Sequence, residues 1–194
     1  LVASIEGAED DEDAGRSEAD ELSLGADDVV VGLAASGNTP YVSAVLQQAR
    51  KQGALTVAMV NNAECRLRGD AEITVHLNSG PEVINGSTRL SAATAQKAAL
   101  NALSTMLMVR LNRTYKNIMV DMAANNIKLS ARRIRMLRAI DPSIDEASAR
   151  ELLTRANGSV KVAVVLNAGG SVADAIQRLE KVDGRLASLI YPSG

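Results

Sequence analysis

The sequence predicts an α/β protein, with a parallel sheet flanked by helices and a small helical region at the C-terminal end. Residues 29–34 and 55–60 are short apolar runs on either side of a helix-length segment. This arrangement is typical of a βαβ unit whose strands are buried on both faces. Beyond residue 90 the apolar residues recur at helical spacing instead. The change of period places the sheet in the first half of the chain.

Three parallel strands are expected, over residues 29–34, 55–60 and 71–77. The first helix begins at Thr39 and Pro40, because a threonine hydroxyl can accept a free backbone N–H and proline at the first helical position loses no hydrogen bond. Such sheets usually have about five strands. Because only three are found, we expect the others to precede residue 1, with residues 1–9 as the tail of a helix.

Long helices are expected over residues 91–111 and 117–140, and a capping box over 143–146 opens about three short helices. The predicted domains are therefore a sheet domain over 1–140 and a small helical domain over 141–194. The second long helix has four arginines on more than one face, which favours a solvated surface over a dedicated anion site. They are Arg132, Arg133, Arg135 and Arg138.

Composition excludes several classes of protein. The chain has 194 residues, 46% of them hydrophobic, and a net charge of −2, which is the profile of a globular protein. Its single cysteine allows no internal disulfide and no cysteine-rich metal cluster. It has three tyrosines and no Phe or Trp, which argues against binding nucleic acid by base stacking. No apolar run reaches the ~20 residues of a membrane helix, so a cytoplasmic location is expected.

The sequence has no motif for a nucleotide or a metal. It contains no G-x-G-x-x-G, no Walker loop and no His or Cys spacing for zinc. Its one histidine, His76, lies in the polar phase of a strand, where a surface position is more common than a catalytic one. We therefore expect no cofactor and no metal. Any chemistry must come from carboxylates, hydroxyls and backbone amides.

Two polar loops are candidate sites. The first, with Ser36, Gly37, Asn38 and Thr39, joins a strand to a helix start, where free N–H groups and hydroxyls suit a phosphate. An ordinary βα turn with a threonine cap fits the same residues. The second loop offers hydroxyls, an arginine and a glutamate for a sugar and its phosphate, or serves only to cap the next helix. Its candidate residues are Glu82, Ser87, Thr88 and Arg89.

The acidic N-terminal segment is the third feature. Residues 1–28 hold eleven acidic residues and one arginine. Such runs are usually solvated surface. One carboxylate among them would become a general base if the fold buried it near the first loop, because burial raises its pKa.

Several separate blocks now form a family pattern. They are Glu6-Gly-Ala-Glu9-Asp10, Gly32-Leu-Ala-Ala-Ser36-Gly-Asn-Thr39-Pro40-Tyr41, Gly80-Pro-Glu82, Gly86-Ser-Thr-Arg89-Leu, Thr94-Ala-Gln-Lys97 and Asn117-Ile-Met-Val-Asp121-Met. In order and content they resemble the N-acetylmuramic acid 6-phosphate etherases over essentially the whole chain. More loosely, they are similar to the glucokinase regulatory protein, which binds sugar phosphates without chemistry.

The resemblance implies a sugar isomerase (SIS) domain followed by a UBA-like helical region, in a homodimer that uses neither metal nor nucleotide. It implies cleavage of the lactyl ether of N-acetylmuramic acid 6-phosphate, by elimination and hydration, to N-acetylglucosamine 6-phosphate and D-lactate in cell-wall sugar recycling. One group removes the proton beside the aldehyde of the ring-opened sugar, and another protonates the leaving lactate.

The family pattern assigns roles to particular residues. Glu9 is the expected acid/base residue, and the two polar loops are expected to bind the sugar phosphate. The family's other catalytic glutamate lies in a Ser-Glu-Cys-Pro block that would precede residue 1. Asn38 stands where the etherases usually have Arg, and Ser91 and Ala93 replace Lys and Gly, which weakens the positive charge available to phosphate.

Two other functions remain as alternatives. A sugar-phosphate-binding regulator would fit the missing second glutamate. An aldose–ketose isomerase of the SIS class is disfavoured, because such isomerases lack the Glu-Gly-x-Glu-Asp block.

Overall fold

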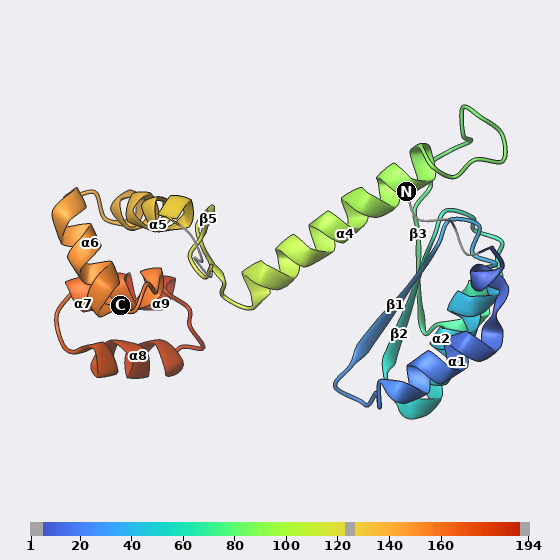
Figure 1. Cartoon of the computed structure of the whole chain (residues 1–194), viewed down its shortest axis with the longest axis horizontal. Coiled ribbons are helices and arrows are strands. Elements are labelled where there is room, and N and C mark those ends of the chain that lie inside the picture. Colours follow the sequence, from blue (N-terminus) through green and yellow to red (C-terminus); the bar gives the residue numbers. More distant parts are fainter. Residues whose placement is uncertain (1–5, 123–126, 191–194) are drawn as a thin grey trace. The chain divides into compact units, whose positions relative to one another are not determined.

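The structure of the chain is a computed structural model that describes residues 6–122 and 127–190. It divides into two compact units, residues 1–102 and 103–194, each described by itself (Figure 1). Helix α4 (Ser91–Arg110) crosses from one unit to the other. The domain boundary expected at residue 140 stays a prediction.

The first unit contains a parallel three-stranded sheet in the order β1-β2-β3. Strand β1 (Val29–Ala34) pairs with β2 (Leu55–Val60) over its whole length, and β2 pairs with β3 (Ile73–His76). The α/β class is therefore confirmed. The first two strands have the predicted bounds, whereas the third is shorter at both ends.

Helix α2 (Pro40–Gln52) packs on one face of this sheet, and the short helix α3 (Leu67–Asp70) lies beside it. Leu46 of α2 is completely buried against Ala58 and Val60 of β2. Gly32 of β1 leaves room for this contact, because a Cβ there would lie 2.8 Å from Leu46 Cδ1. Leu46 can therefore pack into the core of the unit because Gly32 has no side chain.

The acidic segment is more ordered than its charge indicated. The 3-10 turn η1 (Ala8–Asp10) leads into helix α1 (Glu12–Glu21), which packs along α2 (Figure 1). Two small residues make this contact possible. Ala19 is buried, and a Cβ at Gly15 would lie 2.7 Å from the Tyr41 carbonyl oxygen. Acidic side chains add to the contact, because Asp20 accepts hydrogen bonds from Gln48 and Gln52 of α2 at 2.6 and 2.8 Å.

The opposite face of the sheet is only partly covered within the described residues. Val29 and Leu55 are 57% and 38% exposed, although we expected their strands to be buried on both faces, and Ile73 of β3 is 46% exposed, whereas Met59 on the same face is buried. Successive side chains of a strand point to opposite faces, so the side chains of Val29, Leu55 and Ile73 point away from α2. The expectation of burial on both faces is therefore wrong for this part of the chain.

In the second unit, a hairpin follows α4 where the start of the 117–140 helix was predicted. Strands β4 (Thr114–Tyr115) and β5 (Ile118–Met119) pair in antiparallel fashion around a two-residue turn, with Lys116 at a φ of 52°. A positive φ suits such turns and ends any helix. Helix α5 (Ile127–Ile140) forms only the later part of the predicted 117–140 helix, and residues 123–126 lie outside the described residues.

Helices α6 (Glu146–Arg155), α7 (Val160–Asn167), α8 (Val172–Glu180) and α9 (Ala187–Ile190) complete this unit. Its core includes Leu137, Val160 and Leu186. Asp145 caps α6, because its carboxylate accepts a hydrogen bond from Ser148 N at 2.7 Å. The capping box predicted at Ser143 is therefore wrong. The Ser143 hydroxyl donates to Asp141 instead.

Candidate functional site

The carboxyl ends of the three strands lie at one edge of the sheet, and Asn61 joins the loops that follow them. Its N–H donates to Ala35 O at 3.0 Å, behind β1. Its Nδ2 donates to Leu77 O at 3.0 Å, behind β3, and to the hydroxyl of Ser79 at 3.2 Å. Its Oδ1 accepts from Gln96 Nε2 of α4 at 3.0 Å. One side chain thus fixes the edge where ligands bind in parallel sheets.

In the loop after β1, Gly37 is the tightest point. Its φ is +70°, and a Cβ there would lie 2.5 Å from Cys65 Sγ and 3.2 Å from Val60 Cγ1. Its N–H donates to Ala34 O at 3.1 Å, and its carbonyl accepts from Leu67 N at 3.0 Å. The backbone of this loop therefore lies in close contact with the loop that follows β2.

Thr39 precedes α2 as its N-cap, but its side chain makes no capping hydrogen bond. The expected threonine cap is therefore absent, although the helix begins where predicted. The hydroxyl of nearby Ser36 accepts a hydrogen bond from Asn38 N at 3.3 Å and can still donate. Both hydroxyls thus lie at a helix start and remain able to bond to an anion.

The predicted acid/base residue lies in a segment that is tied to this loop. Asn38 Oδ1 accepts from Arg66 N at 3.0 Å, and the Arg66 guanidinium pairs with Glu12 Oε1 at 3.0 Å. The turn η1, which contains Glu9, directly precedes Glu12 and packs on α2. Glu9 itself is exposed, so the described residues do not bury it near the first loop.

The loop after β3 contains the remaining candidates. Glu82 accepts hydrogen bonds from Ser91 N and Ala92 N, both at 2.9 Å, and so caps α4. Ser87 is half-buried, and its hydroxyl accepts from Arg89 N at 3.4 Å. Thr88 and Arg89 are exposed. Glu82 therefore holds the start of α4 while the loop presents a hydroxyl and a guanidinium to solvent.

Comparison with known proteins agrees with this geometry. The sequence profile of the SIS domain matches residues 13–106, which contain the sheet and both polar loops. An N-acetylmuramic acid 6-phosphate etherase of Deinococcus radiodurans is 45% identical over 188 residues, which cover 96% of this chain and 61% of the relative. Residues 13–106 are therefore similar to an SIS domain, and the chain is similar to N-acetylmuramic acid 6-phosphate etherases over most of its length.

Other relatives with that name have a similar identity to this chain and are also longer than it. The etherase of Mycolicibacterium smegmatis is 42% identical over 98% of this chain and 64% of its own length. That of Streptomyces coelicolor is 46% identical over 86% of this chain and 53% of its own length. The chain therefore spans about three fifths of the length of the curated relatives it matches.

Sequence reasoning missed two residues that shape this site. Asn61 was not singled out, although it is the first polar residue after a buried strand, a position that can signal a role at the sheet edge. Arg66, which bonds to Asn38 and pairs with Glu12, gave no local signal. His76 is exposed, as predicted, and its Nε2 lies 3.3 Å from Asn61 O.

The contacts of Glu82 predict a pH dependence for the start of α4. The N–H groups of Ala92 and Ser91 hold the pKa of Glu82 below its ordinary value of 4.5. Because the folded-state pKa is the lower one, the stabilisation is present above pH 4.5 and is lost as the pH falls through the folded-state value. In Glu82→Gln we expect a shallower loss of stability below pH 4.5, measured by urea unfolding at several pH values. An unchanged slope would contradict this capping role.

No group of three His, Cys, Asp or Glu that could hold a metal ion occurs in the parts of the chain that the structure describes. Across the same residues, each helix is too short or too polar to cross a membrane.

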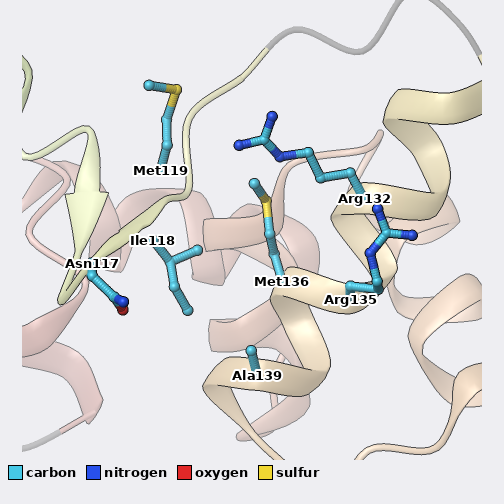
Figure 2. A pocket seen from close by; sticks show the side chains of 7 residues that line it. All are labelled: Asn117, Ile118, Met119, Arg132, Arg135, Met136 and Ala139. Carbon is cyan, nitrogen blue, oxygen red and sulfur yellow. The ribbon is translucent and has the colours of Figure 1, made fainter.

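A hollow of about 560 Å³ lies in the second unit, between the β4–β5 hairpin and α5 (Figure 2). Met119 and Met136 give it an apolar part, and Arg132 and Arg135 lie on its α5 side. Both arginines are exposed, as expected for a solvated surface. This hollow contains none of the residues predicted to bind substrate.

Proposed function

We propose that the protein carrying this chain cleaves the D-lactyl ether of N-acetylmuramic acid 6-phosphate, giving N-acetylglucosamine 6-phosphate and D-lactate in the recycling of cell-wall amino sugars. The observation that carries this proposal is the 45% identity to a named etherase over 96% of the chain. The geometry of the sheet edge supports it, because hydroxyls and a helix start suited to phosphate lie at that edge.

In this proposal the first loop binds the phosphate. The hydroxyls of Ser36 and Thr39 donate to its oxygens, and the glycine at 37 lets the backbone approach closely. Asn38 contributes less charge than an arginine would, and its side chain is already bonded to Arg66. The positive charge for the phosphate therefore comes from Arg89, with Ser87 and Thr88 beside it on the second loop.

Glu9 acts as the acid/base residue on the ring-opened sugar. Elimination removes the proton beside the aldehyde and releases lactate as its alcohol, which takes up a proton. Water then adds across the resulting double bond, so that the hydroxyl replaces the lactyl ether. Glu82 stays out of these proton transfers, because its carboxylate caps α4 and orders the loop that contacts the sugar.

We also propose a homodimer in the cytoplasm. The apolar residues Met106, Leu107 and Val109 of α4 are 61%, 49% and 52% exposed, an arrangement that a second copy would cover. A cytoplasmic location fits a phosphorylated substrate. Sedimentation velocity at micromolar concentration tests the dimer, and a monomer at all concentrations would contradict it.

The decisive experiment is an assay of D-lactate release from N-acetylmuramic acid 6-phosphate by the whole protein that carries this chain, after circular dichroism has shown that it is folded. We expect D-lactate and N-acetylglucosamine 6-phosphate in equal amounts. If that folded protein binds the sugar phosphate but releases no D-lactate, the result would favour a binding protein similar to the glucokinase regulatory protein.

A further inference from the structure

In the second unit, outside the site described above, two cations pair with the carboxylate of Asp121 and a third bonds to the backbone of the next residue, Met122. Asp121 Oδ2 accepts from Lys161 Nζ at 2.8 Å and from Arg113 Nη1 at 2.9 Å. Lys161 is only 7% exposed. The third cation, Arg133, donates from Nη2 to the Met122 carbonyl oxygen at 2.8 Å. One carboxylate balances one of the three positive charges and leaves two.

Arg133 differs from the other arginines of α5. Arg132 and Arg135 are exposed (Figure 2), whereas Arg133 is half-buried and its Nε is buried without a hydrogen-bond partner. Its guanidinium packs on Gly158, where any Cβ would collide with it. Gly158 also has a φ of +78°, so the turn before α7 is shaped to admit this side chain. The expectation of a solvated surface is therefore wrong for Arg133.

The two arginines and Asp121 line a hollow of about 270 Å³ at the start of α7, which we call the cationic pocket, whereas Lys161 holds Asp121 without lining it. Its lining includes Arg113, Asp121, Arg133 and residues 157–160. Ser159 caps α7 by accepting from Val162 N at 3.3 Å, which leaves the earlier amides of the first turn free of a capping bond. A helix start adds further positive potential to that of the arginines.

We propose that the cationic pocket binds a phosphate group. Two guanidiniums that share one carboxylate, one of them fixed by packing, and a helix start are the features that bind a small, highly charged anion. An uncharged sugar would leave the charges unbalanced, and a cation would be repelled. The phosphate is either inorganic phosphate or the monoester of a sugar phosphate. This inference does not depend on the proposed etherase activity.

The test is a titration of the ¹⁵N-labelled chain with inorganic phosphate, followed through the amide signals of residues 158–161 and repeated with sodium chloride at equal ionic strength. We expect saturable shifts with phosphate and none with chloride. Arg113→Gln changes a largely exposed side chain and should weaken phosphate binding about tenfold. Arg133→Gln should weaken phosphate binding at least as much. The matched controls, Arg132→Gln and Arg135→Gln on the same helix, should bind as the unaltered chain does.

Other outcomes of this titration would overturn the proposal. They are an absence of saturation, equal shifts with chloride, or unchanged binding in Arg113→Gln. A parallel titration with glucose 6-phosphate distinguishes the two sources of the phosphate group. Tighter binding than that of inorganic phosphate identifies a sugar phosphate as the ligand, and equal or weaker binding identifies the free ion.

Discussion

Glu9→Gln is expected to lower D-lactate release at least about 100-fold while leaving the fold intact. A positioned acid/base group contributes roughly 10²–10⁴ to the rate of a proton transfer, and glutamine cannot supply it at neutral pH. The change should leave stability unaltered, because Glu9 is exposed in a short turn. The measurement is kcat for D-lactate release, with circular dichroism and thermal unfolding of the variant beside it.

Two further variants decide how the result for Glu9 is interpreted. Glu21→Gln makes the same chemical change at an exposed position at the end of α1, so it should release D-lactate at the unaltered rate. Glu6→Gln tests the other glutamate of the same block. If Glu6→Gln abolished release and Glu9→Gln did not, the acid/base role would move to Glu6. Near-normal turnover in both variants would remove this block from the chemistry.

The βαβ unit could be predicted from the sequence because its signals are local. Residues 29–34 and 55–60 are apolar except for Thr56, and Pro40 and Gly53 mark the two ends of the helix between them. Helix α1 was missed because its charge suggested solvated surface. Only two small residues, Gly15 and Ala19, indicate that α1 packs on α2. Their role cannot be recognised without knowing which other helix they contact.

The candidate site was predicted only as separate loops. Their polar residues are visible in the sequence, but Asn61 bonds to Leu77 and Gln96, which lie 16 and 35 positions away. Local sequence patterns do not encode such contacts. The hairpin at 114–119 was missed for a related reason, since residues 117–119 were counted into a helical repeat that begins later. There the β-forming residues Tyr115 and Ile118 outweigh the helical period.

Gly37→Ala is expected to lower the free energy of unfolding of the first unit by about 2–4 kcal/mol. A non-glycine residue at positive φ costs roughly 1–2 kcal/mol, and overpacking a tight site adds about 1–3 kcal/mol. Here the new Cβ would meet Cys65 Sγ at 2.5 Å and Cys65 Cβ at 2.6 Å. Urea unfolding followed by circular dichroism measures the loss. The loop that contains Ser36 and Thr39 would shift as well, so sugar-phosphate binding should weaken.

Gly86→Ala separates the two causes, because Gly86 has a φ of +86° but no heavy atom within 4 Å of its added Cβ. It should therefore lose only the backbone contribution of roughly 1–2 kcal/mol. Cys65→Gly in the Gly37→Ala background removes the colliding atoms, so it should restore the part of the stability that the collision took. Equal losses in Gly37→Ala and Gly86→Ala would show that Cys65 moves aside at no cost. In that case the contact between the loops would not be what holds Ser36 and Thr39 at the start of α2.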